Sequence, residues 1–207
     1  MKYIIMCGGD DPQQEHPRHI WPIKGEPIVA RTIRLLRQYG VDDISISTNN
    51  RVFEQFGVPL IMSDKTMKNG VWLDCFHLMD KPVCYIFGDV VFSAYAIETI
   101  VNTDTDSIEF YASAEPLPEG YPKEWAEPFA YKVRDHELFR HCVEVAKHYE
   151  RLGLFRRSYG AIAWELWQVI KGTPLNCIDY TNYVAINDWT CDLDKTSDVD
   201  LMERRVQ

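Results

Sequence analysis

Carboxylates occur at two places in the sequence where a metal ion could bind. Asp89 comes soon after the apolar run Val83 to Phe87. An acidic side chain just beyond a buried strand is a natural Mg2+ ligand, because hard cations take carboxylate oxygens together with substrate phosphates. Asp192 and Asp194 alternate along an expected strand, so they share one face and repel each other unless solvated or bridged by a cation. The alternatives are a helix cap for Asp89 and an exposed acidic edge for the pair.

Two glycines follow the first apolar run of the chain, at residues 2–6. Without a Cβ, Gly8 and Gly9 let backbone N–H groups approach phosphate oxygens or the edge of a base. A tight turn is the simpler explanation for a lone glycine pair, and on these residues alone it is the more frequent one.

A sheet is needed to bring these residues together. In the first half, the pattern predicts strands at 2–6, 44–48, 59–62 and 83–87, which alternate with helices from Pro27 to about Gly40, at 51–56, at 69–79 and at 94–101. This alternation is typical of a mostly parallel sheet with helices on both faces, which is a three-layer α/β/α fold. Ligands of such sheets bind beyond the carboxyl ends of the strands, where Gly8 and Asp89 are expected.

The second half of the chain is less regular. We expect strands at 107–112, 129–133, 161–164 and 183–193, with helices at 135–153, at 165–170 and from Ser197 onward. No internal repeat or Gly/Ser-rich linker divides the sequence, so its 207 residues are expected to form a single domain.

The composition disfavours several classes of protein. With 46% hydrophobic and 26% charged residues, the chain is neither disordered nor fibrous. A formal net charge of -9 argues against nucleic-acid binding, and no run reaches the roughly 18 apolar residues of a membrane span. Six cysteines are scattered singly and the first residues show no signal-peptide pattern, so we expect buried thiols in a reducing cytoplasm.

These motifs, in their order, resemble the nucleotidyltransferases that make nucleotide sugars, CDP-alcohols and the molybdenum-cofactor dinucleotide. That family starts with an apolar strand, an Ala-Gly-Gly-like turn, a Gly-x-Arg loop, a Pro-Lys pair and a Gly-Lys-Pro that opens a helix, and it ends with an Asp-x-Asp and a further Asp. The matching segments here are Ile4 to Gly9, Pro17-Arg18, Pro22 to Val29, Arg31 to Ile33, Tyr39 to Ile44, Phe87 to Val90 and Cys191 to Asp198. The resemblance spans the chain, although from about Asn102 to Asp179 it extends to layout only.

The resemblance implies a Rossmann-like mixed sheet and a magnesium-dependent reaction between a nucleoside triphosphate and a phosphorylated small-molecule acceptor, such as a sugar phosphate or a phosphoalcohol. It implies a nucleotide-binding half at about 1–101, an acceptor half at about 102–207, and a monomer or homodimer. Mg2+ would be held by Asp89 and Asp194, with Asp192 as a further ligand, and Arg18 would face the phosphates. The expected nucleotide-binding residues are Cys7, Gly8, Gly9, Thr48, Asn49 and Gly88, and the expected acceptor-binding residues are Lys65, Asn69, Lys132 and Arg157.

The chain departs from the family pattern in its first loop. Asp11 and Gln13 stand where the family has glycine and arginine, and Arg18 stands where it has lysine. A catalytically degenerate nucleotide-binding or regulatory module is therefore one alternative. A GT-A-type glycosyltransferase is another, but it normally carries Asp-x-Asp where this chain has a single acid, Asp89. The retained carboxylates favour nucleotidyl transfer, and the short connection between the third strand and Asp89 favours CTP.

Overall fold

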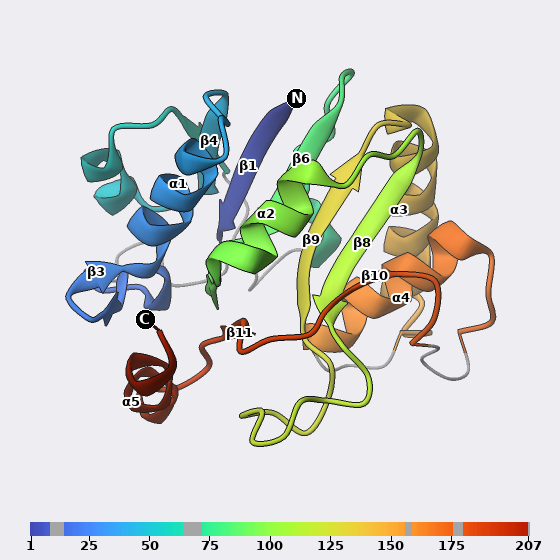
Figure 1. Ribbon diagram of the computed structural model, residues 1–207. Helices are drawn as coiled ribbons and strands as arrows, with labels where there is room; N and C mark the ends of the chain where they lie inside the picture. The colour runs from blue at the N-terminus through green and yellow to red at the C-terminus, as the bar shows by residue number, and fades with distance from the viewer. Residues whose placement is uncertain (9–14, 64–71, 156–158, 176–179, 207) are drawn as a thin grey trace.

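A seven-stranded sheet forms the centre of the molecule. The computed structural model describes residues 1–8, 15–63, 72–155, 159–175 and 180–206, and in this part of the chain the strand order is β10-β8-β9-β6-β1-β4-β5 (Figure 1). The strands are β1 (Lys2–Cys7), β4 (Ile44–Thr48), β5 (Leu60–Met62), β6 (Val83–Phe87), β8 (Ile108–Ser113), β9 (Pro128–Val133) and β10 (Val184–Ile186).

The pairing confirms the predicted mostly parallel sheet. β1 runs parallel to β4 and β6, β5 runs parallel to β4, and β10 runs parallel to β8. Only β9 reverses direction, and it pairs antiparallel with both β6 and β8. Cys7 lies opposite Thr48, and Met6 lies opposite Phe87. The carboxyl ends of β1, β4 and β6 therefore meet at one edge of the sheet.

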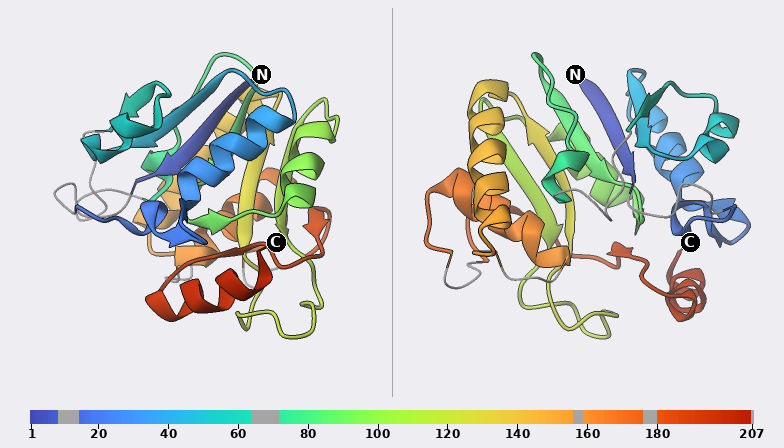
Figure 2. Two further views of the ribbon diagram at one scale, coloured as in Figure 1. Left: turned by 60° about the vertical axis from the view of Figure 1, so that its left-hand side comes forward. Right: turned by 180° about the vertical axis from the view of Figure 1, so that it is seen from behind.

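Helices cover both faces of the sheet. α1 (Ile28–Gln38) and α2 (Ala94–Asn102) lie on one face, and α3 (His136–Arg151) and α4 (Tyr159–Lys171) lie on the other (Figure 2). Short 3-10 helices follow β1, β4 and β5 along the chain: η1 (Arg18–Ile20), η2 (Arg51–Phe56) and η3 (Trp72–Cys75). The three-layer architecture expected from the sequence is thus confirmed.

The ends of the long helices follow from local residue types. Pro27 is the N-cap of α1, and Gly40 ends it with a φ of 80° and an N–H bonded to the Arg37 carbonyl at 3.0 Å. Asp135 caps α3 by accepting a hydrogen bond from the Leu138 N–H at 2.9 Å. Both helices were predicted from these capping residues.

Three predicted elements were wrong. Residues 161–164 were predicted as a strand but lie in α4, which buries Ile162 to Trp167 almost all round and so lacks a helical stripe. In the range predicted as a helix at 69–79, only Trp72–Cys75 of the described residues is helical, as the 3-10 helix η3. The strand predicted at 183–193 is two short strands, β10 and β11 (Cys191–Asp192), because the chain leaves the main sheet between them.

A small second core holds the C-terminal segment in place. Its buried apolar residues are Ile23, Ile28, Val91, Cys191, Leu193, Met202 and Val206. They join α5 (Thr196–Arg205) to the hairpin of β2 (Pro22–Ile23) and β3 (Glu26–Pro27), and to the paired strands β7 (Val90–Val91) and β11. The predicted terminal helix is confirmed, and its packing brings the last acidic motif back to β6.

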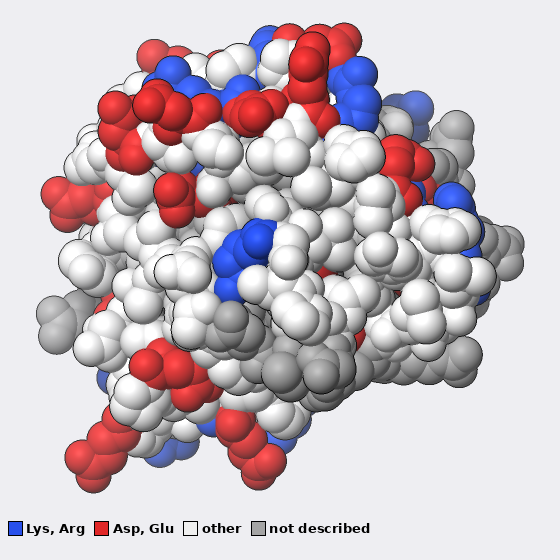
Figure 3. Space-filling view, turned by 90° about the vertical axis from the view of Figure 1, so that its right-hand side faces the viewer, with Lys and Arg blue, Asp and Glu red and all other residues white. Residues whose placement is uncertain are grey.

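The charge of the surface agrees with the acidic composition. On the side that lies to the right in Figure 1, acidic side chains predominate along the upper and lower margins, and the middle is largely uncharged around one small basic group (Figure 3). Among the described residues, no helix is long and apolar enough to cross a membrane.

Candidate active site

The turn after β6 places Asp89 against the end of β1. The Gly88 N–H donates to the Met6 carbonyl at 3.0 Å. A Cβ at Gly88 would lie 2.5 Å from the Cys7 Sγ and 2.6 Å from the Met6 oxygen, so only glycine fits between the strands here. Gly88 and the buried Cys7, both predicted nucleotide-binding residues, pack against each other in this structure. Their packing presents Asp89, whose side chain is 20% exposed, at the edge of the sheet.

The second acidic motif lies beside the first. β11 pairs antiparallel with β7, so that Asp192 lies opposite Val90, and the Leu193 N–H donates to the Asp89 carbonyl at 2.9 Å. Segments separated by about a hundred residues of sequence are therefore joined by backbone hydrogen bonds. The structure brings Asp89, Asp192 and Asp194 together, as the motif order indicated.

Arg18 joins the two motifs through its guanidinium group. Its Nη2 lies 3.0 Å from Asp89 Oδ2, and its Nη1 lies 3.5 Å from Asp194 Oδ1. Arg18 is the first residue of η1, which precedes the hairpin of β2 and β3. One guanidinium thus contacts both carboxylates that were predicted as Mg2+ ligands.

Lys123, which the sequence analysis missed, is the second cation of the site. Its Nζ lies 2.5 Å from Asp194 Oδ2, 3.1 Å from Asp192 Oδ1 and 3.6 Å from Asp198 Oδ2, and its side chain is only 8% exposed. Burial opposes its charge, yet Asp192 and Asp194 raise the pKa of Lys123 above its ordinary value. In the sequence, Lys123 is distinguished only by being the one basic residue between Lys81 and Lys132.

Asp198 completes the group from the start of α5. Its Oδ2 accepts hydrogen bonds from the N–H groups of Asp194 and Lys195 at 3.0 and 3.2 Å. These bonds hold the segment that carries Asp194. We call Asp89, Asp192, Asp194 and Asp198, together with Arg18 and Lys123, the carboxylate cluster.

Negative charge is in excess in the carboxylate cluster, which contains four carboxylates and two cations. Burial and the charge of Asp89 together raise the pKa of Asp192 to about 7, against the opposing effect of Lys123. Burial likewise raises the pKa of Glu127 to about 8, with a contribution from Asp192. Glu127 is a second residue that the sequence analysis missed. The site would hold these carboxylates ionised at neutral pH more readily if further positive charge were bound.

The carboxylate cluster suits a magnesium ion that arrives with its substrate. Among the described residues, no group of three or more His, Cys, Asp or Glu is arranged as a metal site. Mg2+ usually takes one or two protein carboxylates and completes its shell with substrate phosphates and water. Asp89 and Asp194, which contact the same guanidinium, fit that mode, whereas Asp192 Oδ1 is bonded to Lys123.

The predicted nucleotide-binding residues lie at the ends of β1 and β4. Thr48 is fully buried, and its Oγ1 accepts a hydrogen bond from the Asn50 N–H at 3.1 Å, so its side chain shapes the turn into η2. Asn49 beside it is partly exposed. Gly8 is exposed, with open space where a Cβ would stand, and Gly9 lies outside the described residues.

Lys132, predicted as an acceptor-binding residue, lies away from the carboxylate cluster. It lies on β9 opposite Cys84, towards the start of β6 and away from Asp89. Its Nζ donates to the carbonyls of Ile100, Val101 and Thr103 at 3.0, 2.9 and 2.5 Å, which caps the end of α2. The other predicted acceptor-binding residues, Lys65, Asn69 and Arg157, lie outside the described part of the chain.

Comparison with known proteins identifies the fold. No protein-family model matches the sequence, and no curated protein matches it. Among solved structures, a putative glucose-1-phosphate thymidylyltransferase from Bacillus anthracis aligns over 100% of this chain and 96% of its own, with 17% identity and a TM-score of 0.59. The 4-diphosphocytidyl-2C-methyl-D-erythritol synthase from Anaerococcus prevotii aligns over 98% and 94%, with 10% identity and a TM-score of 0.60.

A third similar structure is the CTP:phosphocholine cytidylyltransferase from Streptococcus pneumoniae. It aligns over 98% of this chain and 97% of its own, with 14% identity and a TM-score of 0.53. At these identities the similarity establishes the architecture. The chain therefore has the fold of these nucleotidyltransferases over essentially its whole length.

Proposed function

We propose that the protein is a nucleotidyltransferase that joins a nucleoside triphosphate to a phosphorylated small-molecule acceptor and releases pyrophosphate. One observation carries the proposal. Arg18, Lys123 and Asp89 converge with the last acidic motif beyond the carboxyl end of β6, in a fold shared with nucleotidyltransferases. That end of a parallel sheet is where ligands of such folds bind.

The proposed reaction needs no protein base. A phosphate monoester has a second pKa of about 6, so at neutral pH its oxygen is already a nucleophilic anion. This oxygen forms a bond to the α-phosphorus of the triphosphate, while the bond from the α-phosphorus to the bridging oxygen breaks and pyrophosphate leaves. Positioning two anions and stabilising the charge that develops between them is what the protein must supply.

Arg18 and Lys123 would bind the phosphates. Both are held by carboxylates in this structure, and substrate phosphates offer them equivalent anionic partners. Exchange of partners would leave Asp89 and Asp194 ready to hold Mg2+, with Asp192 as a candidate further ligand. The metal ion would supply Lewis-acid stabilisation of the phosphate oxygens.

The remaining assignments belong to the same proposal. We assign the nucleoside site to the residues at the ends of β1, β4 and β6. Gly8, Gly9 and Asn49 would contact the nucleoside, and Cys7, Gly88 and Thr48 would shape the site. CTP is the first candidate donor. The acceptor would bind to the second half of the chain. Three of the described cysteines, Cys84, Cys142 and Cys191, are free and buried, which is compatible with a reducing cytoplasm. Neither nucleic acid nor a membrane has a part in the proposed reaction.

The proposal is tested by pyrophosphate release. Each of the four common nucleoside triphosphates is incubated with Mg2+ and a panel of sugar 1-phosphates and phosphoalcohols. We expect release with at least one pair, abolished by EDTA and lowered by about a thousandfold or more in Asp89→Asn, because a positioned charge at the reacting phosphates is lost. Asp104→Asn, which changes an aspartate far more exposed than Asp89, is the matched control.

The other outcomes point to the alternatives. If no pair releases pyrophosphate while a nucleotide still binds, the chain is a degenerate nucleotide-binding module. If a finished nucleotide sugar is consumed with release of a nucleoside diphosphate, the chain is a glycosyltransferase. Full activity in Asp89→Asn would refute the metal assignment.

A further inference from the structure

The loop between β8 and β9 carries Lys123. It comprises residues 114–127, contains no helix or strand, and extends past the end of the sheet on the side where α5 lies (Figure 1). Its two ends are joined, because the Ser113 N–H donates to the Glu127 carbonyl at 2.9 Å and the Glu127 N–H donates to Ser113 Oγ at 2.7 Å. The Ala126 carbonyl accepts a hydrogen bond from the buried Trp164 indole at 2.9 Å. The sheet and α4 thus fix the base of the 114–127 loop, whereas Lys123 lies nearer its tip.

The C-terminal segment holds the tip of the 114–127 loop. The Tyr121 hydroxyl donates to the Thr190 carbonyl at 2.9 Å, and the Tyr121 ring packs against the second core. Arg205, in the last turn of α5, donates from Nη2 to the Gly120 carbonyl. Gly120 has a φ of 71°, and a Cβ there would lie 3.2 Å from Arg205 Nη2, so glycine suits both the turn and the close approach. Two contacts therefore tie down the backbone just before Lys123.

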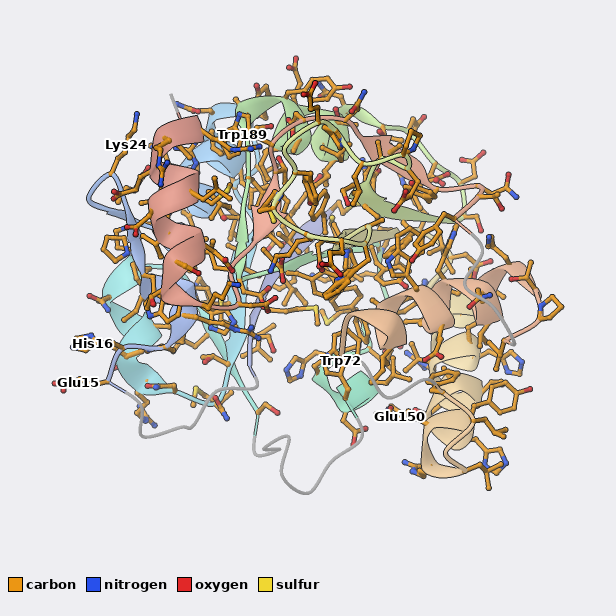
Figure 4. All side chains as sticks on the ribbon, turned by 90° about the horizontal axis from the view of Figure 1, so that it is seen from below. Glu15, His16, Lys24, Trp72, Glu150 and Trp189 are labelled. Atoms are coloured by element: carbon orange, nitrogen blue, oxygen red, sulfur yellow. The ribbon has the colours of Figure 1, made fainter. Side chains whose placement is uncertain are left out.

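The position of α5 is itself fixed by contacts that do not involve the loop. Figure 4 shows α5 between Lys24 of the hairpin and Trp189, which precedes β11. The Lys24 N–H donates to Glu203 Oε1 at 3.1 Å, and Met202 is fully buried in the second core. A side chain on a packed helix is positioned more precisely than one on a loop. Arg205 can therefore act as a fixed point for the tip.

The proposed reaction would release other contacts of the tip. In this structure Lys123 is bound by three carboxylates of the carboxylate cluster. In the proposed function Asp194 holds Mg2+ and Lys123 turns to the phosphates, so ion pairs that now restrain the tip are given up. The hydrogen bonds of Gly120 and Tyr121 involve neither metal ligands nor phosphates, and they can persist through this exchange. They would then keep Lys123 within reach of the phosphates.

We propose that Arg205 is a positioning residue that acts through Lys123, by holding the tip of the 114–127 loop at the carboxylate cluster while the lysine binds phosphate. The inference rests on the proposed nucleotidyl transfer and adds to it a residue beyond Asp198, where the last family-like segment ends. A charge that is displaced by about 1 Å from the reacting phosphates remains present but loses much of its effect on the rate. Loss of Arg205 should therefore misplace Lys123 without removing any group of the carboxylate cluster.

The adjacent arginine provides a matched control. Arg204 is exposed, and its Nε donates to the Asp200 carbonyl of its own helix at 3.1 Å. Pyrophosphate release is measured at saturating Mg2+ and substrates. We expect kcat to fall about tenfold in Arg205→Met, to recover at least partly in Arg205→Lys, which keeps a charged donor, and to stay unchanged in Arg204→Met.

A double-mutant cycle separates positioning from stability. If Arg205 acts through Lys123, Arg205→Met should not lower kcat further in the Lys123→Met background, because no lysine is left to misplace. A merely structural role would lower the free energy of unfolding and leave the kcat of the folded protein unchanged. Tyr121→Phe, which removes only the hydroxyl that bonds Thr190, is the second variant and should show the same dependence on Lys123 if Arg205→Met does not fold.

Limited proteolysis reports the position of the tip without any turnover. Trypsin can cut inside the 114–127 loop only after Lys123, because the loop contains no other Lys or Arg. The side chain of Lys123 is only 8% exposed, so this cut should be slow in the wild type. We expect it to be about tenfold faster in Arg205→Met than in Arg204→Met, since loss of one charged hydrogen bond shifts the opening of the tip by that order. Each variant lacks one tryptic site at the end of α5, so the two are directly comparable.

The outcomes separate this inference from the proposed function. Wild-type kcat in Arg205→Met, or an equal loss of kcat with and without Lys123, would overturn the inference while the proposed function stands. Equal rates of cleavage after Lys123 in Arg205→Met and Arg204→Met would also overturn it. If the wild type releases pyrophosphate from no donor, nucleotidyl transfer is refuted, and the cleavage rates still show whether Arg205 holds the tip.

Discussion

Two buried lysines at opposite ends of the sheet have opposite surroundings. Lys123 lies beyond the end of β6 with three carboxylates within 3.6 Å of its Nζ. Lys132 lies on β9, opposite the start of β6, where its Nζ donates to three backbone carbonyls at the end of α2. Burial lowers the pKa of Lys132, whereas the carboxylates raise that of Lys123 in spite of burial.

We propose that this difference separates a cation with a structural role, Lys132, from one with a functional role, Lys123. The partners of Lys132 are neutral groups that need donors at the end of any helix, so this lysine completes the fold. The partners of Lys123 are carboxylates that outnumber the nearby cations. In the proposed function, this concentration of negative charge lies where a metal ion and phosphates would exchange with the lysine.

In the comparison of the two lysines, the largest expected effect is on turnover in Lys123→Met, which removes the cation and keeps much of the side-chain volume. We expect kcat to fall about a hundredfold or more, because a positioned charge on the phosphates is lost. The fall should be measured by pyrophosphate release at saturating Mg2+. Lys81→Met, at an exposed position near the start of β6, is the control and should leave kcat unchanged. A Lys123→Met enzyme with normal turnover would reduce Lys123 to a structural role like that of Lys132.

The next effect is on the pH dependence of stability, through Glu127. Burial raises its pKa from 4.5 to about 8, so between these values the folded protein holds a proton that the unfolded chain has lost. The free energy of unfolding of the wild type should therefore fall as the pH rises from about 4.5 to about 8, by on the order of a few kcal/mol from this group. Glu127→Gln should lose much of that slope, and the raised pKa of Asp192 should account for part of what remains.

Urea unfolding in EDTA at several pH values checks the Glu127 prediction. The neighbouring Glu124→Gln, at an exposed position, serves as the control and should leave the wild-type slope intact. Identical slopes in Glu127→Gln and the wild type would show that Glu127 does not hold its proton in the folded state.

The hydrophobic periodicity of the sequence and its turn-forming residues predicted most of the fold. The strands from Ile44 to Thr48 and from Val83 to Phe87 were placed correctly, because buried parallel strands are short apolar runs bounded by polar turns. The region of α4 was misread for the same reason, since a helix buried almost all round also appears as an apolar run. Hydrophobic periodicity shows which face of an element is apolar. Where every face is buried, it does not distinguish a helix from a strand.

The residues of the candidate site also differ in whether the local sequence pattern predicts them. Asp89, Asp192 and Asp194 could be found because they follow or alternate along strands, so their position is set by local geometry. Lys123 could not, because it lies between β8 and β9 in an irregular segment where no period relates a residue to the site. Lys132 was predicted as an acceptor-binding residue without knowledge of its place in the sheet, because that place depends on β9 running antiparallel, which only the pairing reveals.

The smallest expected effect is on stability in Lys132→Met, which tests the structural role of Lys132. Three carbonyls near the end of α2 lose their charged donor, so we expect the free energy of unfolding to fall by about 1–3 kcal/mol. The KM for the phosphorylated acceptor should stay unchanged, because Lys132 lies away from Asp89 across the sheet. Thermal unfolding and initial rates measured on the same preparation separate the two effects. A raised KM with unchanged stability would return Lys132 to the acceptor site and remove the contrast with Lys123.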